Sequence, residues 1–184
     1  MSTVSAPATK TTWAIDPAHT SVEFSVRHLM ITTVKGRFTD VKGTVTSDEA
    51  DPATGQVDIT IGTASIDTRE SQRDEHLRSA DFFEVEKFPA MHFKSRKLTS
   101  VSGDQFKLVG DLTIRDVSRE VVLDVTSHGR AKDPWGGQRA GFEATTKIKR
   151  SDFGLTWNQV LEAGGVVVGD EIKISIDAQL VQQA

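Results

Sequence analysis

The chain has 184 residues and a formal net charge of −4, with 37% hydrophobic and 26% charged residues. This balance excludes an intrinsically disordered chain and a membrane-spanning protein, and it is typical of one soluble, folded domain. Because Lys and Arg give neither an overall basic field nor a local run, we expect no nucleic-acid partner. Cysteine is absent, which excludes disulfides, thiolate metal sites and a cysteine nucleophile.

The N-terminal residues 1–12 are small and polar and show no apolar period. They are predicted to form a flexible arm ahead of a single domain at residues 13–184. A secretory signal has a basic segment followed by an apolar one, and residues 1–12 have neither, so we expect a cytoplasmic protein. The longest apolar runs are far shorter than the roughly twenty residues that span a bilayer, so no transmembrane segment is expected.

From Trp13 onward, apolar and polar residues alternate with a period of two, as at Val22, Phe24 and Val26. This pattern indicates half-buried β-strands. It recurs at residues 34–45, 57–61, 91–101, 106–114, 121–125, 140–148 and 172–180. Turn signals at 51–55, 102–104, 133–137 and 163–165 separate the runs, and short connections favour antiparallel neighbours. Seven or eight such strands either close a barrel or fold into a sandwich, and the barrel is favoured.

One segment departs from the strand pattern. Residues 71–83 (SQRDEHLRSADFF) lack the alternation and contain good helix formers, with Ser71 available as an N-cap and Asp74 three residues later. The sequence predicts a single short helix here. The expected fold class is therefore all-β with one helix.

The inward rows of the predicted strands mix Phe with Gly, Ala and Ser instead of being filled with Leu and Ile. Such a mixture either leaves a cavity or lets large and small side chains alternate to fill a tapering barrel. The residue pattern by itself leaves both interpretations open.

Several sequence blocks together carry a family resemblance. They are WAIDPAHTS at 13–21, VRHL at 26–29, GRF at 36–38, RDEHLRSADFF at 73–83, FPAMHF at 88–93 and RSDFGL at 150–155. On these blocks the chain resembles the YceI family of polyisoprenoid-binding, lipocalin-like proteins. The resemblance spans nearly all of the chain from Trp13 onward. Asp116 is one departure, because the family usually has Gly at that position.

The resemblance implies an extended, antiparallel, lipocalin-like β-barrel of about eight strands, often a homodimer, with a long-chain lipid threaded through its interior. The function that it implies is non-catalytic binding, and transport or storage, of a polyisoprenoid, an isoprenoid quinone or a fatty-acyl compound. No cofactor is implied beyond this bound lipid. Many relatives are periplasmic, so the cytoplasmic location is expected from residues 1–12 and not from the resemblance.

The candidate ligand contacts are apolar residues of the inward rows, together with the two Phe residues that follow the predicted helix. They are Phe24, Phe38, Ile59, Ile61, Phe82, Phe83, Phe93, Leu108, Leu112, Ile114, Phe142, Phe153, Leu155 and Trp157. Each of them either lines a lipid tunnel or belongs to an ordinary core, because both share the inward face of a barrel. Phe82 and Phe83 either cover one mouth of the barrel or anchor the helix to it.

The main polar cluster consists of Arg69, Arg73, Asp74, His76 and Arg78. Of these, Arg69, Arg73 and His76 are candidate contacts for a lipid head group. Arg suits this role because its planar guanidinium binds phosphate and carbonyl oxygens through several donors. The alternative is structural, with Arg73 and Asp74 bracing the helix against a loop through ion pairs.

Two further functions stay open at this point. The five His residues have no metal-binding spacing, so no metal site is expected, and motifs for a nucleophile elbow or a phosphate loop are absent. An enzyme acting on an isoprenoid or fatty-acyl lipid would draw on Arg73, Asp74 and His76. A stress-related interaction protein would instead use the barrel to present its loops to a partner.

Overall fold

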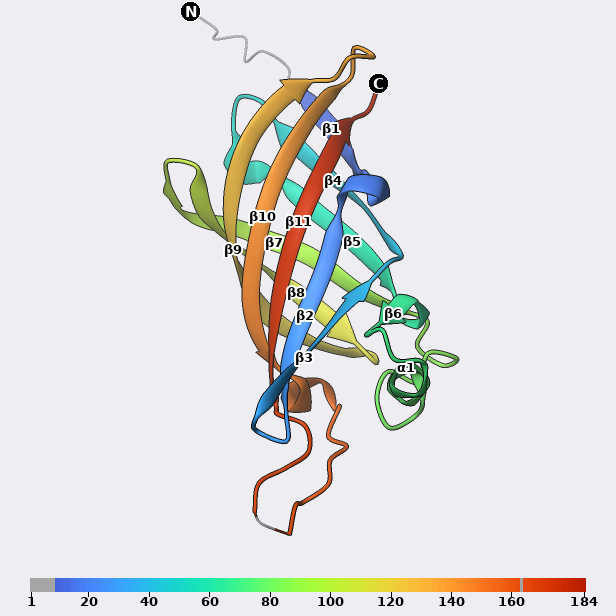
Figure 1. The fold of residues 1–184 in the computed structure, drawn as a ribbon. Coiled ribbons are helices and arrows are strands. Elements are labelled where there is room, and N and C mark those ends of the chain that lie inside the picture. The colour runs from blue at the N-terminus through green and yellow to red at the C-terminus, as the bar shows by residue number, and fades with distance from the viewer. Residues whose placement is uncertain (1–8, 163) are drawn as a thin grey trace, which may run out of the picture.

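The computed structural model describes residues 9–162 and 164–184, and antiparallel strands make up most of it (Figure 1). The strands are β1 (Lys10–Ile15), β2 (Ser21–His28), β3 (Thr32–Phe38), β4 (Val41–Asp48), β5 (Gln56–Gly62), β6 (Ile66–Asp67), β7 (Ala90–Ser102), β8 (Gln105–Ile114), β9 (Val117–Lys132), β10 (Gln138–Lys149) and β11 (Glu171–Gln182). The helix is α1 (Ser71–Arg78), and short 3₁₀ turns include η1 (Pro17–His19), η2 (Pro52–Thr54), η3 (Thr63–Ser65) and η4 (Arg150–Phe153).

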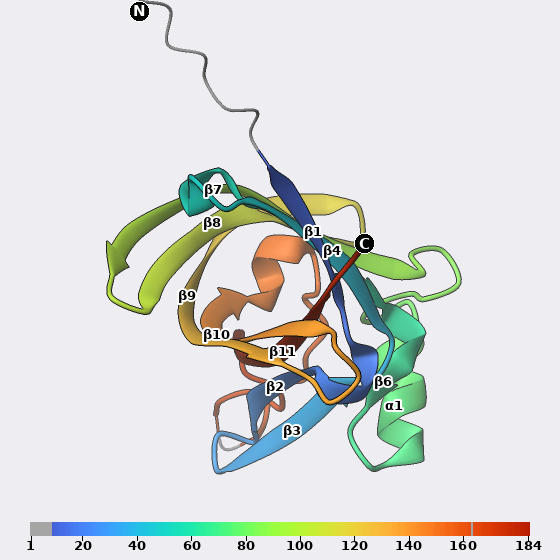
Figure 2. The same cartoon turned by 90° about the horizontal axis from the view of Figure 1, so that it is seen from above.

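Eight of these strands close into a barrel, which confirms the predicted fold class. They follow the order β1, β4, β5, β7, β8, β9, β10 and β11, and β11 pairs back to β1 through Leu180 opposite Ile15 and Gln182 opposite Trp13. The closed wall is visible when the molecule is seen from above (Figure 2). Closure pairs strands all the way round, so the barrel has no free edge along this ring.

The long strand β11 has two partners on the same side. Near the C-terminus it pairs with β1, and further down it pairs with β2 from Asp177 opposite Ser21 to Lys173 opposite Ser25. The chain bends between the two partners at η1. Strand β2 then carries β3 and the short β6 outward from the barrel. The excursion from η3 to residue 89, which includes α1, lies beside this lower part (Figure 1).

The structure corrects several predicted boundaries. Residues 10–12 belong to β1 and pair with β4, so they are not part of a flexible arm, and residues 1–8 lie outside the described residues. The alternating run at 34–45 is two strands, broken at Thr39 and Asp40, because β3 leaves the barrel wall and β4 joins it. The inward parity also shifts by one residue at this break, from the even positions of β3, such as Phe38, to the odd positions of β4, such as Val41 and Val45.

The helix is shorter than predicted. It ends at Arg78, and its N-cap is Glu70, whose carboxylate accepts hydrogen bonds from the backbone N–H groups of Gln72 and Arg73. Ser71 is instead the first helical residue. A Glu side chain can satisfy the free N–H groups at a helix start in the same way as the shorter Ser or Asp side chains.

The close packing of β3 against β2 depends on a glycine. Gly36 on β3 faces the ring of Phe24 on β2, and a Cβ there would lie 2.4 Å from Phe24 Cζ and 2.8 Å from Thr68 Cγ2. No other residue fits at this position without moving the ring. The turn from β8 to β9 tolerates a departure from Gly, because Asp116 adopts a φ of 60° and Asp accepts this left-handed conformation better than most residues.

Arg139 on β10 ties together three segments at the upper end of the barrel. Its Nη1 donates to Asp16 at 2.7 Å and its Nε donates to Asp133 at 2.8 Å. The hydrogen bond from Arg139 is the main cause that lowers the pKa of Asp133. Hydrogen bonds from His19 and then from Arg139 lower the pKa of Asp16.

We predict that the free energy of unfolding falls as the pH drops below about 4. A carboxylate with a lowered folded-state pKa adds stability above its unfolded-state value, here 3.8, and loses it as the pH falls through the folded-state pKa. The variant Asp133→Asn should be less stable than the parent at pH 7, with a shallower acid dependence. Urea unfolding at a series of pH values checks this, and parallel curves for the two proteins would contradict it.

Candidate functional site

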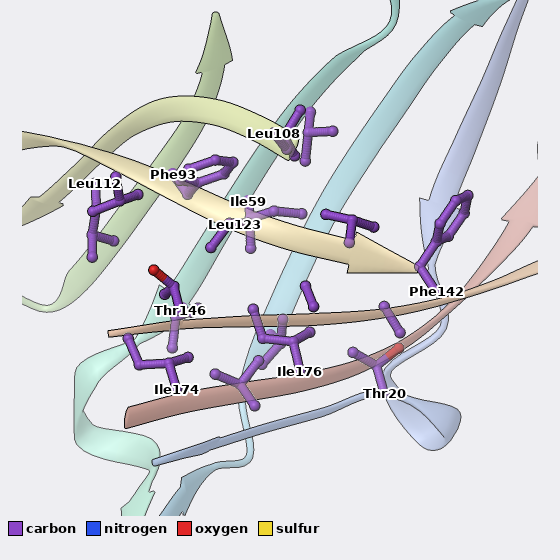
Figure 3. Close-up of a pocket in the computed structure, with 18 of the residues that line it drawn as sticks. Thr20, Ile59, Phe93, Leu108, Leu112, Leu123, Phe142, Thr146, Ile174 and Ile176 are labelled. Atoms are coloured by element: carbon purple, nitrogen blue, oxygen red, sulfur yellow. The ribbon is translucent and has the colours of Figure 1, made fainter. Parts of the chain in front are cut away.

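A cavity of about 810 Å³ runs inside the barrel, and every one of the eight barrel strands contributes to its wall. Figure 3 shows side chains from opposite strands, among them Phe93, Leu123, Phe142 and Ile176, directed into the same space. The lining is overwhelmingly aliphatic and aromatic. The mixture of large and small inward residues therefore leaves a cavity and does not simply fill a tapering barrel.

The strand period explains why the cavity is apolar. On β11, Ile172, Ile174 and Ile176 point inward and line the cavity, while the residues between them face solvent. These three side chains are only half-buried, because the cavity leaves part of their inner surface accessible. Side chains in a close-packed core would lose that surface to their neighbours. The barrel thus keeps an accessible apolar surface on its inside.

The structure places most of the apolar residues that were singled out from the sequence in this wall. The lining includes Phe24, Phe38, Ile59, Ile61, Phe82, Phe83, Phe93, Leu108, Leu112, Ile114, Phe142 and Leu155. Phe153 and Trp157 are not among the lining residues. Phe153 is 1% exposed in the core below the cavity, and the ring of Trp157 packs against Phe82 and His76.

Aromatic rings from β2, β3 and the segment after α1 pack against one another beside the cavity. The ring of Phe38 lies 5.6 Å from Phe24 and 5.7 Å from Phe83, and Phe82 lies 5.5 Å from Trp157. Phe82 and Phe83 therefore anchor the segment that follows α1 to the barrel, and the same two rings line the cavity. Such ring pairs contribute on the order of 1 kcal/mol each beyond the area that they bury.

The polar residues of the helix have structural partners. Asp74 is buried and accepts hydrogen bonds from the backbone N–H and hydroxyl of Thr68. Arg73 donates to the hydroxyl and the backbone carbonyl of the same Thr68, at 2.8 Å in each case. Arg73 and Asp74 thus brace the helix against the loop before it. They do so through hydrogen bonds to Thr68 and not through an ion pair with each other.

None of the three candidate head-group contacts reaches the cavity. Arg69, with a φ of 64°, is exposed on an outer hollow of the sheet. His76 is hydrogen-bonded to Asp81 at 2.8 Å, outside the barrel wall. Together with Arg73, which holds Thr68, these residues lie around α1 on the outside of the lower barrel.

The cavity does contain a cation that the sequence interpretation missed. Arg150, the first residue of η4 directly after β10, is 6% exposed and lines the lower end of the cavity. Its guanidinium donates to the backbone carbonyls of Leu155, Trp157, Val168 and Gly169, at 2.8 to 3.2 Å. Burial lowers the pKa of Arg150. The sequence pattern could have revealed Arg150, because the even-numbered residues from 140 to 148 face inward and residue 150 continues this series.

The opposite end of the cavity is more polar. Ser47, Asp51, Asp104 and Arg130 belong to the lining there, and Arg130 also forms an ion pair with Glu49 at 3.0 Å. Among the described residues, the Ser47 hydroxyl is the one buried side-chain polar atom without a hydrogen-bond partner. A buried hydroxyl usually has a partner, so this one marks a place where an oxygen or amide of a ligand would be favoured.

Other kinds of site find no support in the part of the chain that the structure describes. It brings no three His, Asp or Glu side chains into a group that could hold a metal ion. For residues 9–162 and 164–184, no helix has the length and apolar character needed to cross a membrane.

Known proteins resemble this chain in sequence and in structure. The family model of the YceI-like domain matches residues 13–180. The protein YceI of Salmonella newport is 41% identical over 165 residues, which cover 90% of this chain and 83% of the relative. The crystal structure of the Campylobacter jejuni YceI protein superposes with a TM-score of 0.72 and 35% identity, over 86% of this chain and 90% of that one.

A more distant structure shares the fold. It is a polyisoprenoid binding domain from Saccharophagus degradans, with a TM-score of 0.65, 14% sequence identity, and coverage of 91% of this chain and 97% of that one. At this low sequence identity, the comparison shows a shared arrangement of the strands and nothing more.

We predict that Arg150→Met lowers the free energy of unfolding by at least about 2 kcal/mol, because four backbone carbonyls lose a charged donor. Arg150→Lys should recover only part of the loss, since one ammonium group cannot reach all four carbonyls. Urea unfolding measures both effects. The matched control is Lys149→Met, at the exposed neighbouring position, which should change stability little.

Proposed function

This chain belongs to the family of YceI-like domains, and on that premise we propose that it binds a long apolar lipid inside its barrel without catalysing a reaction. The observation that carries the proposal is the apolar cavity of about 810 Å³, whose wall includes all eight barrel strands. A volume of this size lies in the usual range of small-molecule sites. The name of the Saccharophagus degradans domain, a polyisoprenoid binding domain, supports a prenyl chain as one class of ligand.

The energetics favour a long, flexible hydrocarbon. Each buried methylene contributes roughly 0.8 kcal/mol, so a chain that follows the barrel axis gains affinity with length until the cavity is full. The wall offers few directional contacts that would select one hydrocarbon skeleton. We therefore infer that chain length and width set the specificity, with polyisoprenoids, isoprenoid quinones and fatty-acyl compounds as candidates.

The polar atoms of the cavity suggest how an oxygen-bearing end would be held. At the upper end, the free hydroxyl of Ser47 lies in the same wall as Arg130. At the lower end, Arg150 already donates to four carbonyls, which leaves it little capacity for a ligand. We propose that a polar head group, where the lipid has one, lies at the upper end.

The finer parts of the function stay predictions. Transport and storage both require reversible binding, and measurement of exchange between the protein and lipid acceptors separates them. The expected homodimer can be checked by analytical ultracentrifugation, and the expected cytoplasmic location by fractionation of cells that express the full chain. An enzyme reading would need a reacting group in the cavity, and Arg73, Asp74 and His76 are absent from its lining.

The direct experiment is native mass spectrometry of the purified protein, followed by extraction with organic solvent. We expect a co-purifying prenyl, quinone or fatty-acyl compound, in at least part of the molecules. Repeated recovery of protein that neither carries such a compound nor takes one up from added lipid would sink the proposal.

A cavity-filling variant gives a sharper prediction. Ala144 on β10 is a small residue in the cavity wall, and in Ala144→Phe the ring would occupy space that the lipid needs. We expect its affinity for a fluorescent fatty acid or prenol to fall at least about tenfold, while circular dichroism still reports a folded β-protein. The matched control is Val122→Phe on β9, which is 39% exposed on the outer face and should bind as the parent does. Equal binding by both variants would argue against the interior site.

A further inference from the structure

Two loops lie at the lower end of the barrel as drawn in Figure 1, and both carry exposed apolar side chains. Met30 and Ile31, in the turn between β2 and β3, are 53% and 72% exposed, and Val160, in the loop after η4, is 84% exposed. We refer to Leu29, Met30, Ile31 and Val160 as the apolar tip. Isolated apolar residues on a surface are common, whereas several on adjoining loops indicate a binding surface.

The two loops of the apolar tip are joined to each other. The backbone N–H of Leu29 donates to the carbonyl of Val167 at 2.8 Å, and His28 forms a β-bridge with Val168. Val168 also lines the lower end of the cavity, as does Val26 on β2. Backbone contacts therefore join the exposed tip directly to residues that line the cavity.

The backbone of the tip is unusual for its sequence. Leu29 and Met30 have φ values of 51° and 60°, and the Ile31 N–H donates to the His28 carbonyl at 3.1 Å. Three residues separate His28 from its partner Thr32, and the first two of them have positive φ, which Asn and Gly adopt more readily than Leu and Met. Large apolar side chains are disfavoured there. Strain of this kind, together with side chains that face away from the core, is typical of a functional segment.

A row of cations lies above the tip on the outer face of the sheet. Lys147 on β10 is directly opposite Lys173 on β11, Lys173 is opposite Ser25 on β2, and Ser25 is opposite Lys35 on β3. Like charges directly opposite each other destabilise a sheet. Ser25 is three residues from His28, so this basic row lies roughly 10 Å along β2 from the tip.

The charge balance of this outer hollow differs from that of the whole chain. Its lining has five cationic and three anionic side chains, whereas the chain has a net charge of −4. The cations are Lys35, Arg37, Arg69, Lys147 and Lys173, and the anions are Glu23, Asp67 and Asp124. Asp67 is paired with Arg37 at 3.3 Å. The hollow as a whole therefore favours an anionic partner.

We propose that the apolar tip docks the protein onto a lipid bilayer, with Met30, Ile31 and Val160 entering the interfacial region and the basic row facing anionic head groups. Apolar side chains beside a basic surface are the combination that binds anionic bilayers reversibly. The inference rests on the proposed function in one respect, which is the role of docking. Docking at this end would bring the cavity close to a bilayer that supplies or accepts the lipid.

The test is co-sedimentation with phosphatidylcholine vesicles, with and without phosphatidylserine. The parent is expected to bind both, and to bind the anionic vesicles more tightly. The variant Met30→Ser/Ile31→Ser/Val160→Ser should lose at least about tenfold in affinity for both kinds of vesicle. The variant Lys35→Gln/Lys147→Gln/Lys173→Gln should lose mainly the preference for phosphatidylserine.

Two further variants separate docking from folding and from overall hydrophobicity. Leu29→Asn/Met30→Gly introduces residues that adopt positive φ more readily, so it should raise the thermal unfolding temperature and still weaken vesicle binding. The matched control is Trp135→Ser, which removes an 84% exposed apolar side chain from the hairpin between β9 and β10 at the opposite end of the barrel. This control should bind vesicles as the parent does.

Several outcomes would overturn the proposal. The first is that the parent protein does not bind vesicles, and the second is that the Trp135→Ser variant loses binding. The third is that the parent is a dimer that does not bind vesicles and the tip variant is a monomer. The last result would make the tip an interface between two copies of the chain. The cavity-filling variant Ala144→Phe should still bind vesicles although it takes up less lipid. Vesicle binding and lipid uptake are therefore measured separately, and the docking proposal and the proposed function can fail independently.

Discussion

The pairing of β11 with β1 is the contact on which the rest of the structure depends. It closes the eight-strand ring, so the backbone hydrogen bonds of the wall are satisfied by neighbouring strands and not by the interior. A sandwich of two sheets would hold together mainly by packing across its middle. A closed barrel can keep an accessible apolar interior because its wall is held by continuous hydrogen-bond ladders. The cavity follows from this closure, given the small side chains among the inward residues.

The strands could be predicted from the sequence because a half-buried strand repeats every two residues whatever its neighbours are. The break between β3 and β4 was missed, although the inward parity shifts by one residue between Phe38 and Val41, and the change of strand partners at this break is not visible in the sequence. Partner choice depends on residues far away in the chain. The presence of a cavity could not be predicted for a related reason. The same mixture of Phe, Gly and Ala suits either a packed or a hollow barrel, and only the positions of the strands in space decide between them.

The apolar part of the candidate site was predictable to the extent that it lies on the inward parity. Phe153 and Trp157 failed this criterion because they follow β10 in an irregular segment, where parity carries no information. The polar part was sought where charged residues cluster in sequence, around Arg73. A helix beside the barrel places such a cluster outside the wall. Arg150 also has charged neighbours, Lys149 and Asp152, but these two are exposed, whereas the inward parity of β10 takes Arg150 to the cavity.

The same buried cation links the inside of the barrel to its outer tip. Arg150 holds the carbonyl of Val168, and Val168 both lines the cavity and bridges His28 beside the turn with Leu29 and Met30. To widen the barrel between two of its strands, a long ladder of hydrogen bonds would have to break. To move the loop at Val168, the contacts of one guanidinium and a few backbone bonds have to change. Because a local opening needs only the free energy of the contacts that it breaks, the lower end is a less costly route into the cavity than a gap in the wall.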